Sequence, residues 1–530
     1  MNAPLFLPVL FPVLCGLIIL TIPQRLRRIG ALAAAILELG VCVLVFVQSW
    51  HAPVSLSLGG WDAPVGIMLY IDRFGAVMLL LTSFIFLMLF VFEYDEPGAN
   101  RLFYMLFLVL EGLICGLILL DDLFSVFVLI EVSAIVVSLL IMFRKDGRAM
   151  YNGLVYLLIN IFSATFMLLG LAMLYRQTGT VSMRLLSDIL GSLTDLRMFY
   201  LPYALIMTAI CLKAAIMPLF LWLPMAHGTP SSPPVVSAVL SGLYVKSGIY
   251  LFIRCSAAFS AIDMHGFFLI AGAVTALVGL VFAIAQSDIK LILSYHTVSQ
   301  IGLIMVALNM GNETAMWGGM YHIINHAVFK TVLFLGAGEI IARYKTRNIY
   351  EIKGVAKRMP LLTAAMVMAI LGNTGAPLFN GSISKYLISL SGDMLSHIEL
   401  ITISLGTIVS FVKFSGIFFG ESQATDIQPL SPNRGAVSVI FGSLCLVLGV
   451  AASPIIKLLF GVAVHVEARE YMIKSIEYFV YIAGAMCIYR LLVKGRSGWK
   501  KIRAVNIGFN GIAMSVVGFF VVITGYLFLR

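Results

Sequence analysis

Apolar residues along this chain occur in long uninterrupted runs instead of alternating with polar ones. Many of the runs reach twenty residues, the length that an α-helix needs to cross a hydrocarbon layer about 30 Å thick. The stretch from Leu108 to Leu120 shows none of the period-two alternation of a β-barrel strand. Because every backbone N–H and C=O in lipid needs an internal partner, the pattern predicts an all-α polytopic membrane protein.

The runs predict about sixteen spanning segments. They lie near 4–22, 30–49, 71–93, 102–120, 122–143, 151–175, 199–222, 234–254, 265–286, 290–309, 316–342, 360–391, 399–420, 436–460, 474–493 and 505–528. The positive charges follow the apolar run of residues 1–23, at Arg25–Arg28, and do not precede it, so we interpret this run as a retained first helix and not as a cleaved leader. The stretch 178–198 is predicted to be an amphipathic external loop.

The positions of the charged residues predict how the chain is oriented in the membrane. Of the 530 residues 61% are hydrophobic and only 11% are charged, and the net charge is +10. The basic residues gather in short connections at Arg25–Arg28, Arg144–Arg148, Arg343–Arg358 and Lys494–Arg503. All four fall on the cytoplasmic side if the N-terminus is outside, as the positive-inside rule requires. The charge is thus explained by topology, and a nucleic-acid partner is not expected.

An internal repeat is suggested by matches at a nearly constant offset. Gly153 and Gly319, Gly170 and Gly336, and Asp122 and Asp288 are each 166 positions apart. The Pro-Leu-Phe of 218–220 recurs at 377–379. Chance is the better explanation for any single match, but four matches in order favour a repeat. Five helices separate equivalent points, which predicts two inverted five-helix units at 102–254 and 265–420, flanked by helices in 1–101 and 436–530.

Charged residues occur inside predicted spans, and five of them are candidate site residues. An ionisable group at the centre of a bilayer costs about 2.5–3.5 kcal/mol, so each one calls for an explanation. Static ion pairing between helices explains a single such residue about as well as function does. One acid and four lysines spread over both halves favour an ion path instead: Glu131, Lys213, Lys246, Lys330 and Lys385.

Two histidines extend this set. His322, His326 and Lys330 follow one another at i, i+4 and i+8, so they share one face of one helix. Such a polar stripe suits a hydrated path into the bundle. A metal site is a weaker interpretation, because the two histidines are not part of an HExxH motif and no acid is near them in sequence. The seven cysteines form no CxxC pair, so neither a metal nor an iron–sulfur cofactor is expected.

Two spans are predicted to be broken beside a lysine. Pro218 interrupts the segment of Lys213, and Gly375 with Pro377 interrupts the segment that ends in Lys385. Proline removes a backbone donor and clashes with the preceding turn, so it breaks a helix in its interior. Broken backbone at membrane depth survives only where it is buried in protein or lines a wet cavity.

Lysine suits proton transfer because desolvation disfavours its charged form, so a buried lysine can release and retake a proton. A nearby carboxylate favours the charged form again. At an effective dielectric near 20, a charge pair about 4 Å apart interacts by roughly 4 kcal/mol, enough to control a proton. A change in the separation of Glu131 and Lys213 would therefore gate the transfer.

Long segments resemble the antiporter-like family, which comprises the L, M and N subunits of respiratory complex I, the A and D subunits of Mrp sodium/proton antiporters, and subunits of membrane-bound hydrogenases. The resemblance covers about 100–420 and rests on segments such as LKAAIMPLFLWLPMAHG, HIINHAVFKTVLFLGAG and LGNTGAPLFNGSISKYLI. It implies that Glu131 and Lys213 form the coupled pair of the first unit, and that Lys246 links towards the centre, with His322 and His326 beside it. Lys330 and Lys385 would serve the second unit, with Lys385 at the exit.

The resemblance also sets the remaining expectations. The connection Lys494–Arg503 is too short for the lateral helix of the L type, and a lysine at 385 resembles the N and D types. Family members carry no redox cofactor. The implied partners are other membrane-arm subunits, the lipid bilayer, and protons or sodium ions, in a prokaryotic cytoplasmic membrane.

Four functions compete to explain these features. The first is a proton-translocating subunit of a redox-driven complex, either a hydrogenase or a relative of NADH–quinone oxidoreductase, and the second a subunit of a stand-alone Mrp-type Na⁺/H⁺ antiporter. A self-sufficient solute carrier lacks a substrate-sized polar pocket in the sequence, and no residues suggest a membrane enzyme with its own quinone or metal site. The sequence leaves the ion, the parent complex and the direction of coupling open.

Overall fold

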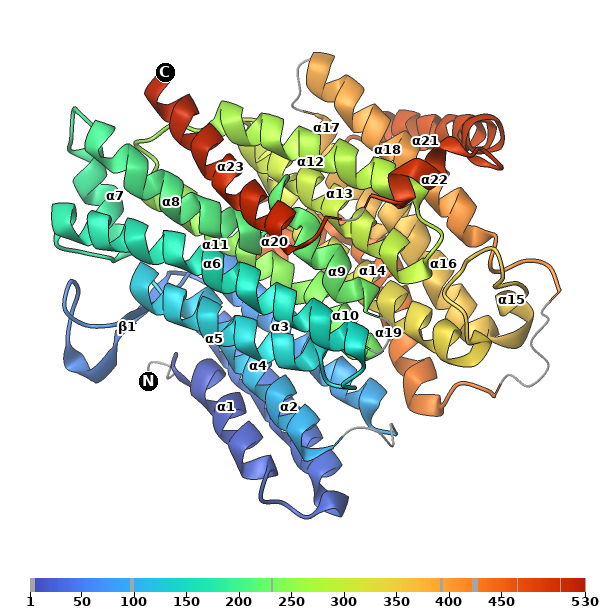
Figure 1. The fold of residues 1–530 in the computed structure, drawn as a ribbon, viewed down its shortest axis with the longest axis horizontal. Helices are drawn as coiled ribbons and strands as arrows, with labels where there is room; N and C mark the ends of the chain where they lie inside the picture. The colour runs from blue at the N-terminus through green and yellow to red at the C-terminus, as the bar shows by residue number, and fades with distance from the viewer. Residues whose placement is uncertain are drawn as a thin grey trace. The chain divides into compact units, whose positions relative to one another are not determined.

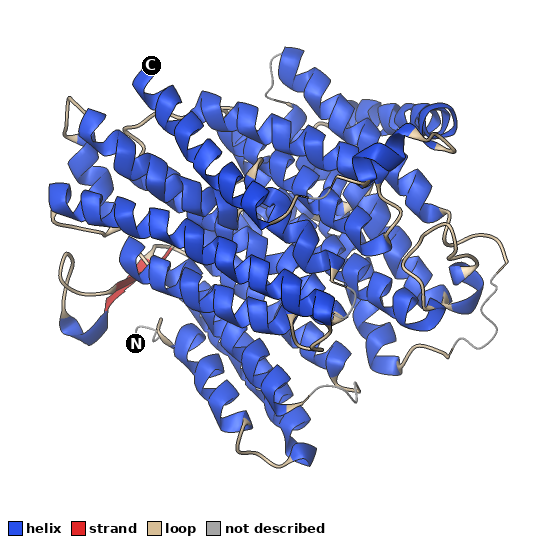
Figure 2. Ribbon diagram, in the orientation of Figure 1, coloured by secondary structure: helices blue, strands red, loops and turns tan. Residues whose placement is uncertain are grey.

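The computed structural model describes residues 5–95, 100–229, 232–390, 394–421, 428–464, 466–505 and 507–529. Most of this part of the chain is helical, which confirms the predicted all-α architecture (Figure 2). Its sheet is a two-stranded antiparallel hairpin of β1 (Val54–Ser57) and β2 (Met68–Ile71), in which Val54 pairs with Ile71.

The helices form two compact units. Unit 1 comprises Met1–Ser232, Leu243–Met264 and Ile507–Arg530. Besides the hairpin it contains α1 (Leu7–Ile19), α2 (Gln24–Gln48), η1 (Leu58–Gly60), α3 (Arg73–Glu93), α4 (Arg101–Leu119), α5 (Leu123–Ile141), α6 (Gly147–Thr178), α7 (Met183–Gly191), α8 (Arg197–Lys213), η2 (Leu219–Leu221), α9 (Trp222–Gly228), α11 (Val245–Ala258) and α23 (Phe509–Leu529).

Unit 2 comprises Pro233–Gly242 and His265–Asn506. Its helices are α10 (Pro234–Val239), α12 (His265–Ala285), α13 (Ile289–Asn309), α14 (Glu313–Tyr344), α15 (Val355–Arg358), α16 (Pro360–Thr374), α17 (Asn380–Ser389), α18 (Met394–Ser415), α19 (Pro432–Val450), α20 (Ala452–Phe460), α21 (Ala468–Ile488), η4 (Tyr489–Val493) and α22 (Gly498–Arg503). The π-helical turn η3 (Leu240–Tyr244) continues α10 into α11, so one helix belongs to both units (Figure 1 labels the elements).

Thirteen helices of the described residues are long and apolar enough to cross a membrane. Leu7–Ile19 and Pro360–Thr374 are apolar but shorter. This result confirms a polytopic membrane protein but not the predicted count of about sixteen spans. The prediction of a loop at 178–198 was wrong in part, because α7 occupies nine of these residues with Leu186 and Leu190 buried.

Several features of the two halves of the chain lie at one constant offset. Helices α6 and α14 both have 32 residues, and they start at Gly147 and Glu313, 166 positions apart. Asp146 and Asn312, also 166 apart, cap their first turns by accepting backbone N–H groups. The isolated bridges Asp122–Ser182 and Asp288–Asn348 keep the same offset. These matches support the predicted repeat; the inverted orientation and the domain limits at 102–254 and 265–420 stay predictions.

Both predicted helix breaks are present in the backbone. Helix α8 ends at Lys213, the 3₁₀ turn η2 follows Pro218, and α-helix resumes only with α9 at Trp222. Helix α16 ends at Thr374, where Gly375 adopts a φ of +85° that favours glycine, and α17 starts at Asn380. Each break therefore lies within a few residues of a predicted site lysine.

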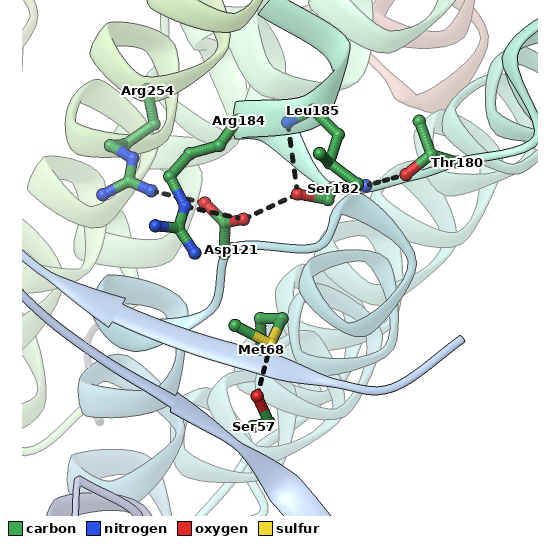
Figure 3. A network of polar contacts seen from close by, with 8 residues as sticks. All are labelled: Ser57, Met68, Asp121, Thr180, Ser182, Arg184, Leu185 and Arg254. Atoms are coloured by element: carbon green, nitrogen blue, oxygen red, sulfur yellow. Dashed lines mark hydrogen bonds and ion pairs between the residues drawn. The ribbon is translucent and has the colours of Figure 1, made fainter. Parts of the chain in front are cut away.

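A buried ion-paired network in unit 1 ties the end of α4 to α11 and α7. Asp121 accepts hydrogen bonds from Arg254 at 3.0 Å, from Ser182 at 2.8 Å and from Arg184 at 3.4 Å (Figure 3). Both guanidinium groups also lie over the ring of Tyr70. Because a buried carboxylate without its partners is costly, this network fixes the helix that carries Lys246.

Candidate functional site

The ammonium group of Lys213 is held by a chain of hydroxyl groups inside unit 1. Its side chain is 2% exposed, and Nζ donates to Ser133 Oγ on α5 at 3.1 Å. The same ammonium lies 3.4 Å from the ring centroid of Tyr244. Tyr244 OH is 3.1 Å from Ser133 Oγ and accepts from Tyr156 OH on α6 at 3.0 Å. A hydroxyl chain of this kind can hold a lysine and pass a proton, since each O–H both donates and accepts.

Glu131 lies near this lysine without forming an ion pair with it. Its side chain is half-buried on α5, and the buried Oε1 has no hydrogen-bond partner. The charges of Glu131 and Lys213 nevertheless interact electrostatically. The structure thus places the predicted pair in one electrostatic neighbourhood, with Ser133 holding the ammonium group directly. Their coupled role stays a prediction.

Lys246 is fully buried in α11, directly after the π-helical turn Leu240–Tyr244. Turns of this kind are frequent at functional sites because they widen a helix locally. Two residues further, a Cβ on Gly248 would lie 2.6 Å from Ala214 N and from Lys213 C. Glycine at 248 therefore lets α11 lie directly against the end of α8.

Trp222 stabilises the first break. Its indole N–H donates at 2.8 Å to Leu212 O, a carbonyl group in the last turn of α8 that also accepts from Ala215 N at 3.0 Å. Pro218, which cannot donate a backbone hydrogen bond, lies between Leu212 and Trp222 in the chain. The break is thus a satisfied, rigid feature.

In unit 2, His322 links two helices. Its Nε2 is 3.0 Å from Gln300 Oε1 on α13, and its Nδ1 is 2.8 Å from Ser384 Oγ on α17. An amide oxygen only accepts, so Nε2 carries a proton and Nδ1 accepts from Ser384 in the neutral ring. The imidazole can therefore receive a proton on one nitrogen and release it from the other.

The other predicted residues of α14 follow on the same face. His326 and Lys330 are fully buried, and the His322 and His326 ring centroids are 6.2 Å apart. Lys330 Nζ donates to Leu293 O on α13 at 3.0 Å. The i, i+4, i+8 stripe predicted from the sequence thus points into the interior of unit 2.

Lys385 lies beside the second break. Its Nζ donates to Asn373 O, in the last turn of α16, at 2.9 Å. A Cβ on Gly375 would lie 3.1 Å from Lys385 Cδ. A carbonyl group that the end of α16 leaves without a backbone donor thus becomes the acceptor for the lysine. The predicted transfer from Lys246 to His322 and His326 joins residues of different units and stays a prediction.

Several polar residues of these sites were not predicted. Ser133, Tyr244 and Tyr156 contact Lys213 or one another, and Gln300 and Ser384 contact His322. Hydroxyl and amide side chains are common in spans, so only the fold identifies them. Helix α18 contributes Lys413, which donates to three carbonyl groups at the end of α12.

Two buried acids were also missed, although the criterion that singles out Glu131 applies to them as well. Glu38 of α2 and Glu111 of α4 are both 0% exposed, and Glu38 accepts a hydrogen bond from Cys42 at 3.4 Å. The charges of the two glutamates interact. Within the described ranges, no group of three or more His, Cys, Asp and Glu side chains is placed to hold a metal ion.

Fold and site together define a class: a polytopic helical membrane protein with titratable side chains buried beside two broken helices. Residues 121–410 match the family model described as "NADH:quinone oxidoreductase/Mrp antiporter, TM", which covers more than half of the chain. The chain belongs to this family, and it is an antiporter-like integral membrane protein.

Relatives match over most of their length. The chain is 28% identical to the D-type subunit of the Na⁺/H⁺ antiporter of Alkalihalophilus pseudofirmus, over 90% of this chain and 99% of the relative. It is 26% identical to the D-type subunit of the Na⁺/H⁺ antiporter of Bacillus subtilis, over 87% and 94%.

Two solved structures share the fold. One is from the Mrp complex of Dietzia sp. DQ12-45-1b, with a TM-score of 0.80 and 24% identity, covering 90% of this chain and all of the other. The second is from the membrane-bound sulfane sulfur reductase, an archaeal respiratory membrane complex, with a TM-score of 0.79 and 24% identity, covering 91% and all of the other.

Proposed function

We propose that the chain translocates protons across a prokaryotic cytoplasmic membrane as one subunit of a larger complex, with its N-terminus outside. The observation that carries this proposal is Lys213: a buried ammonium on a hydroxyl chain, within the field of Glu131 but not paired with it. An ammonium bound this way can lose its proton to a neighbour without breaking an ion pair. A static structural lysine would be expected to have a carboxylate partner.

In this proposal a proton is passed between Lys213, Lys246 and the stripe of His322, His326 and Lys330, and it leaves at Lys385. Each transfer moves a proton from an ammonium or imidazolium N–H to the lone pair of the next nitrogen or of a bridging water. Approach of Glu131 would hold the proton on Lys213, and its retreat would release it. Pro218, Gly375 and Pro377 keep the two helix breaks in place.

Two parent complexes remain candidates. A redox-driven complex, hydrogenase-like or related to NADH–quinone oxidoreductase, is supported by the shared fold with the respiratory sulfane sulfur reductase. A stand-alone Mrp-type Na⁺/H⁺ antiporter is supported by the relatives of A. pseudofirmus and B. subtilis, which are subunits of Na⁺/H⁺ antiporters. In both, other membrane subunits are the partners and the chain needs no cofactor of its own.

The test is proton flux in vesicles that contain the purified complex. Flux that follows an electron donor assigns the redox-driven complex, and flux that needs a sodium gradient assigns the antiporter. The Lys213→Ala and Glu131→Ala variants should assemble and carry no flux. Normal flux in either variant would refute the role given to that residue.

A further inference from the structure

Helix α21, which follows the two predicted five-helix units, forms one wall of a cavity beside the second broken helix. The cavity has a volume of about 110 Å³ and lies within unit 2. Its polar lining includes Lys385 and Ser382 of α17 and, from α21, Tyr471, Lys474 and Glu477. A space of this size, with polar side chains along part of its wall, holds several water molecules, since one water needs only about 10–15 Å³ of such volume.

Two tyrosine hydroxyl groups of α21 make hydrogen bonds at the second helix break. Tyr471 OH accepts from the N–H of Leu378 at 2.9 Å and lies 2.9 Å from Ser382 Oγ. Tyr478 OH lies 2.8 Å from Thr374 Oγ1 at the end of α16. Unwound backbone needs such partners at membrane depth. Helix α21 therefore belongs to the second lysine site structurally.

The same helix also brings charge to the cavity. Lys474 donates to Glu477 Oε2 at 3.1 Å, and their side chains are 43% and 37% exposed. A charged pair on a helix that is apolar enough to span the membrane is costly in lipid, so it calls for a polar environment. Glu477 also lies 3.5 Å from Tyr481 OH, another residue of the lining. The partly buried Lys385 and the half-exposed carboxylate of Glu477 thus line the same cavity.

We propose that this cavity is the water-filled outlet of the second lysine site, and that Glu477 receives the proton that Lys385 releases. The ammonium of Lys385 gives a proton through water to the carboxylate of Glu477, leaving a neutral amine and a neutral acid. Glu477 then gives the proton to external water, and the amine is reprotonated from inside the unit. Lys474 holds the carboxylate in place between transfers.

This inference rests on the proposed function, and it assigns a role to a helix outside the predicted repeats. With the N-terminus outside, the start of α21 lies at the outer face, because the basic segment Lys494–Arg503 that follows its other end is cytoplasmic. The outlet would therefore open away from the cytoplasm. Tyr471 and Tyr478 act as positioning residues, and Glu477 as the group that takes the proton.

The first experiment measures access and does not depend on transport. A cysteine replaces Ser475, which lines the cavity, in a Cys487→Ala background, because Cys487 is the exposed native thiol of the described residues. A membrane-impermeant maleimide should label it in right-side-out vesicles and not in inside-out vesicles. No labelling, or labelling only from the cytoplasmic face, would overturn the outlet. This readout is unaffected if the wild-type complex proves not to move protons.

The second experiment measures flux. Glu477→Gln should lower proton flux by about tenfold or more, as expected for the loss of a positioned proton acceptor. Glu477→Asp should retain at least about half of the flux, which a purely structural role of the side chain would not predict. Glu421→Gln, at an exposed glutamate outside the cavity, is the matched control and should leave flux unchanged. If Ser475→Cys is labelled but Glu477→Gln has normal flux, the cavity is open to water and Glu477 is not on the proton path.

Discussion

The two units hold their lysines in different ways on a matching scaffold. In unit 1 the ammonium of Lys213 contacts a side-chain hydroxyl and an aromatic face. In unit 2 the ammonium groups of Lys330 and Lys385 donate to backbone carbonyl groups, Leu293 O and Asn373 O. Side-chain contacts can be changed by rotation, whereas a carbonyl acceptor moves only with its helix. The contacts of Lys213 can therefore change by side-chain rotation alone, whereas the acceptors of Lys330 and Lys385 are fixed by the positions of α13 and α16.

Positions 166 apart sharpen the contrast. Tyr156 of α6 corresponds to His322 of α14, and both are hydrogen-bonded in their unit. Glu131 of α5 corresponds to Thr297 of α13, so unit 2 has no acid at the position equivalent to Glu131. The acid that shares a cavity with a lysine in unit 2 is Glu477 of α21. The repeat thus keeps the scaffold while the titratable side chains differ.

The largest effect is expected from Lys213→Met, which keeps an unbranched side chain but removes the ammonium. Proton flux should fall by at least about 100-fold, because no other group on the hydroxyl chain carries a labile positive charge. Lys500→Met, at an exposed position of α22, is the control and should leave flux unchanged. Flux of the wild-type level in reconstituted vesicles would exclude Lys213 from the path.

The Gly248→Ala variant should disrupt the close contact between the end of α8 and α11 in unit 1. The added Cβ would meet backbone at 2.6 Å, which cannot move aside as a side-chain end can. Overpacking costs about 1–3 kcal/mol, so we expect a lower melting temperature and a flux reduced by about tenfold. Gly518→Ala on α23 meets open space and should change neither value. Equal behaviour of the two variants would show that the α8–α11 contact is not critical.

Gly375→Ala tests the backbone mechanism of unit 2. The residue has a φ of +85°, so alanine adds strain of about 1–2 kcal/mol, and its Cβ presses on the Lys385 side chain. Flux should fall by about fivefold. Gly495→Ala has a similar φ of +74° but no neighbour within 4 Å, so it should share the strain and keep the flux. An equal loss of flux in Gly375→Ala and Gly495→Ala would show that backbone strain alone causes the effect.

The smallest effect is expected at His322. Its two hydrogen bonds connect α13 to α17, but a water in the vacated space can replace the imidazole as a bridge. His322→Ala should lower flux by about two- to fivefold with the complex assembled. Loss of assembly, seen by size-exclusion chromatography, would instead indicate a structural role.

The sequence predicted the features that depend on the length of apolar runs and on isolated charges. Long apolar runs indicate spanning helices, and Pro218, Gly375 and Pro377 indicated both helix breaks. It could not reveal which acceptor holds each lysine, because Ser133 and Leu293 look ordinary in the sequence and are selected only by helix packing. Lys213 was predicted to lie within a span, but the break makes it the last residue of α8. Glu38 and Glu111 also lie within predicted spans, so the signal that marks Glu131 was present for both.

In the proposed function, Glu131 controls the proton on Lys213 through charge and not through contact. The decisive experiment measures proton flux, with and without sodium, in vesicles that contain the Glu131→Gln or the Glu131→Asp complex. We expect no flux for Glu131→Gln, which keeps the shape but not the charge, and substantial flux for Glu131→Asp. Wild-type flux in Glu131→Gln would contradict it.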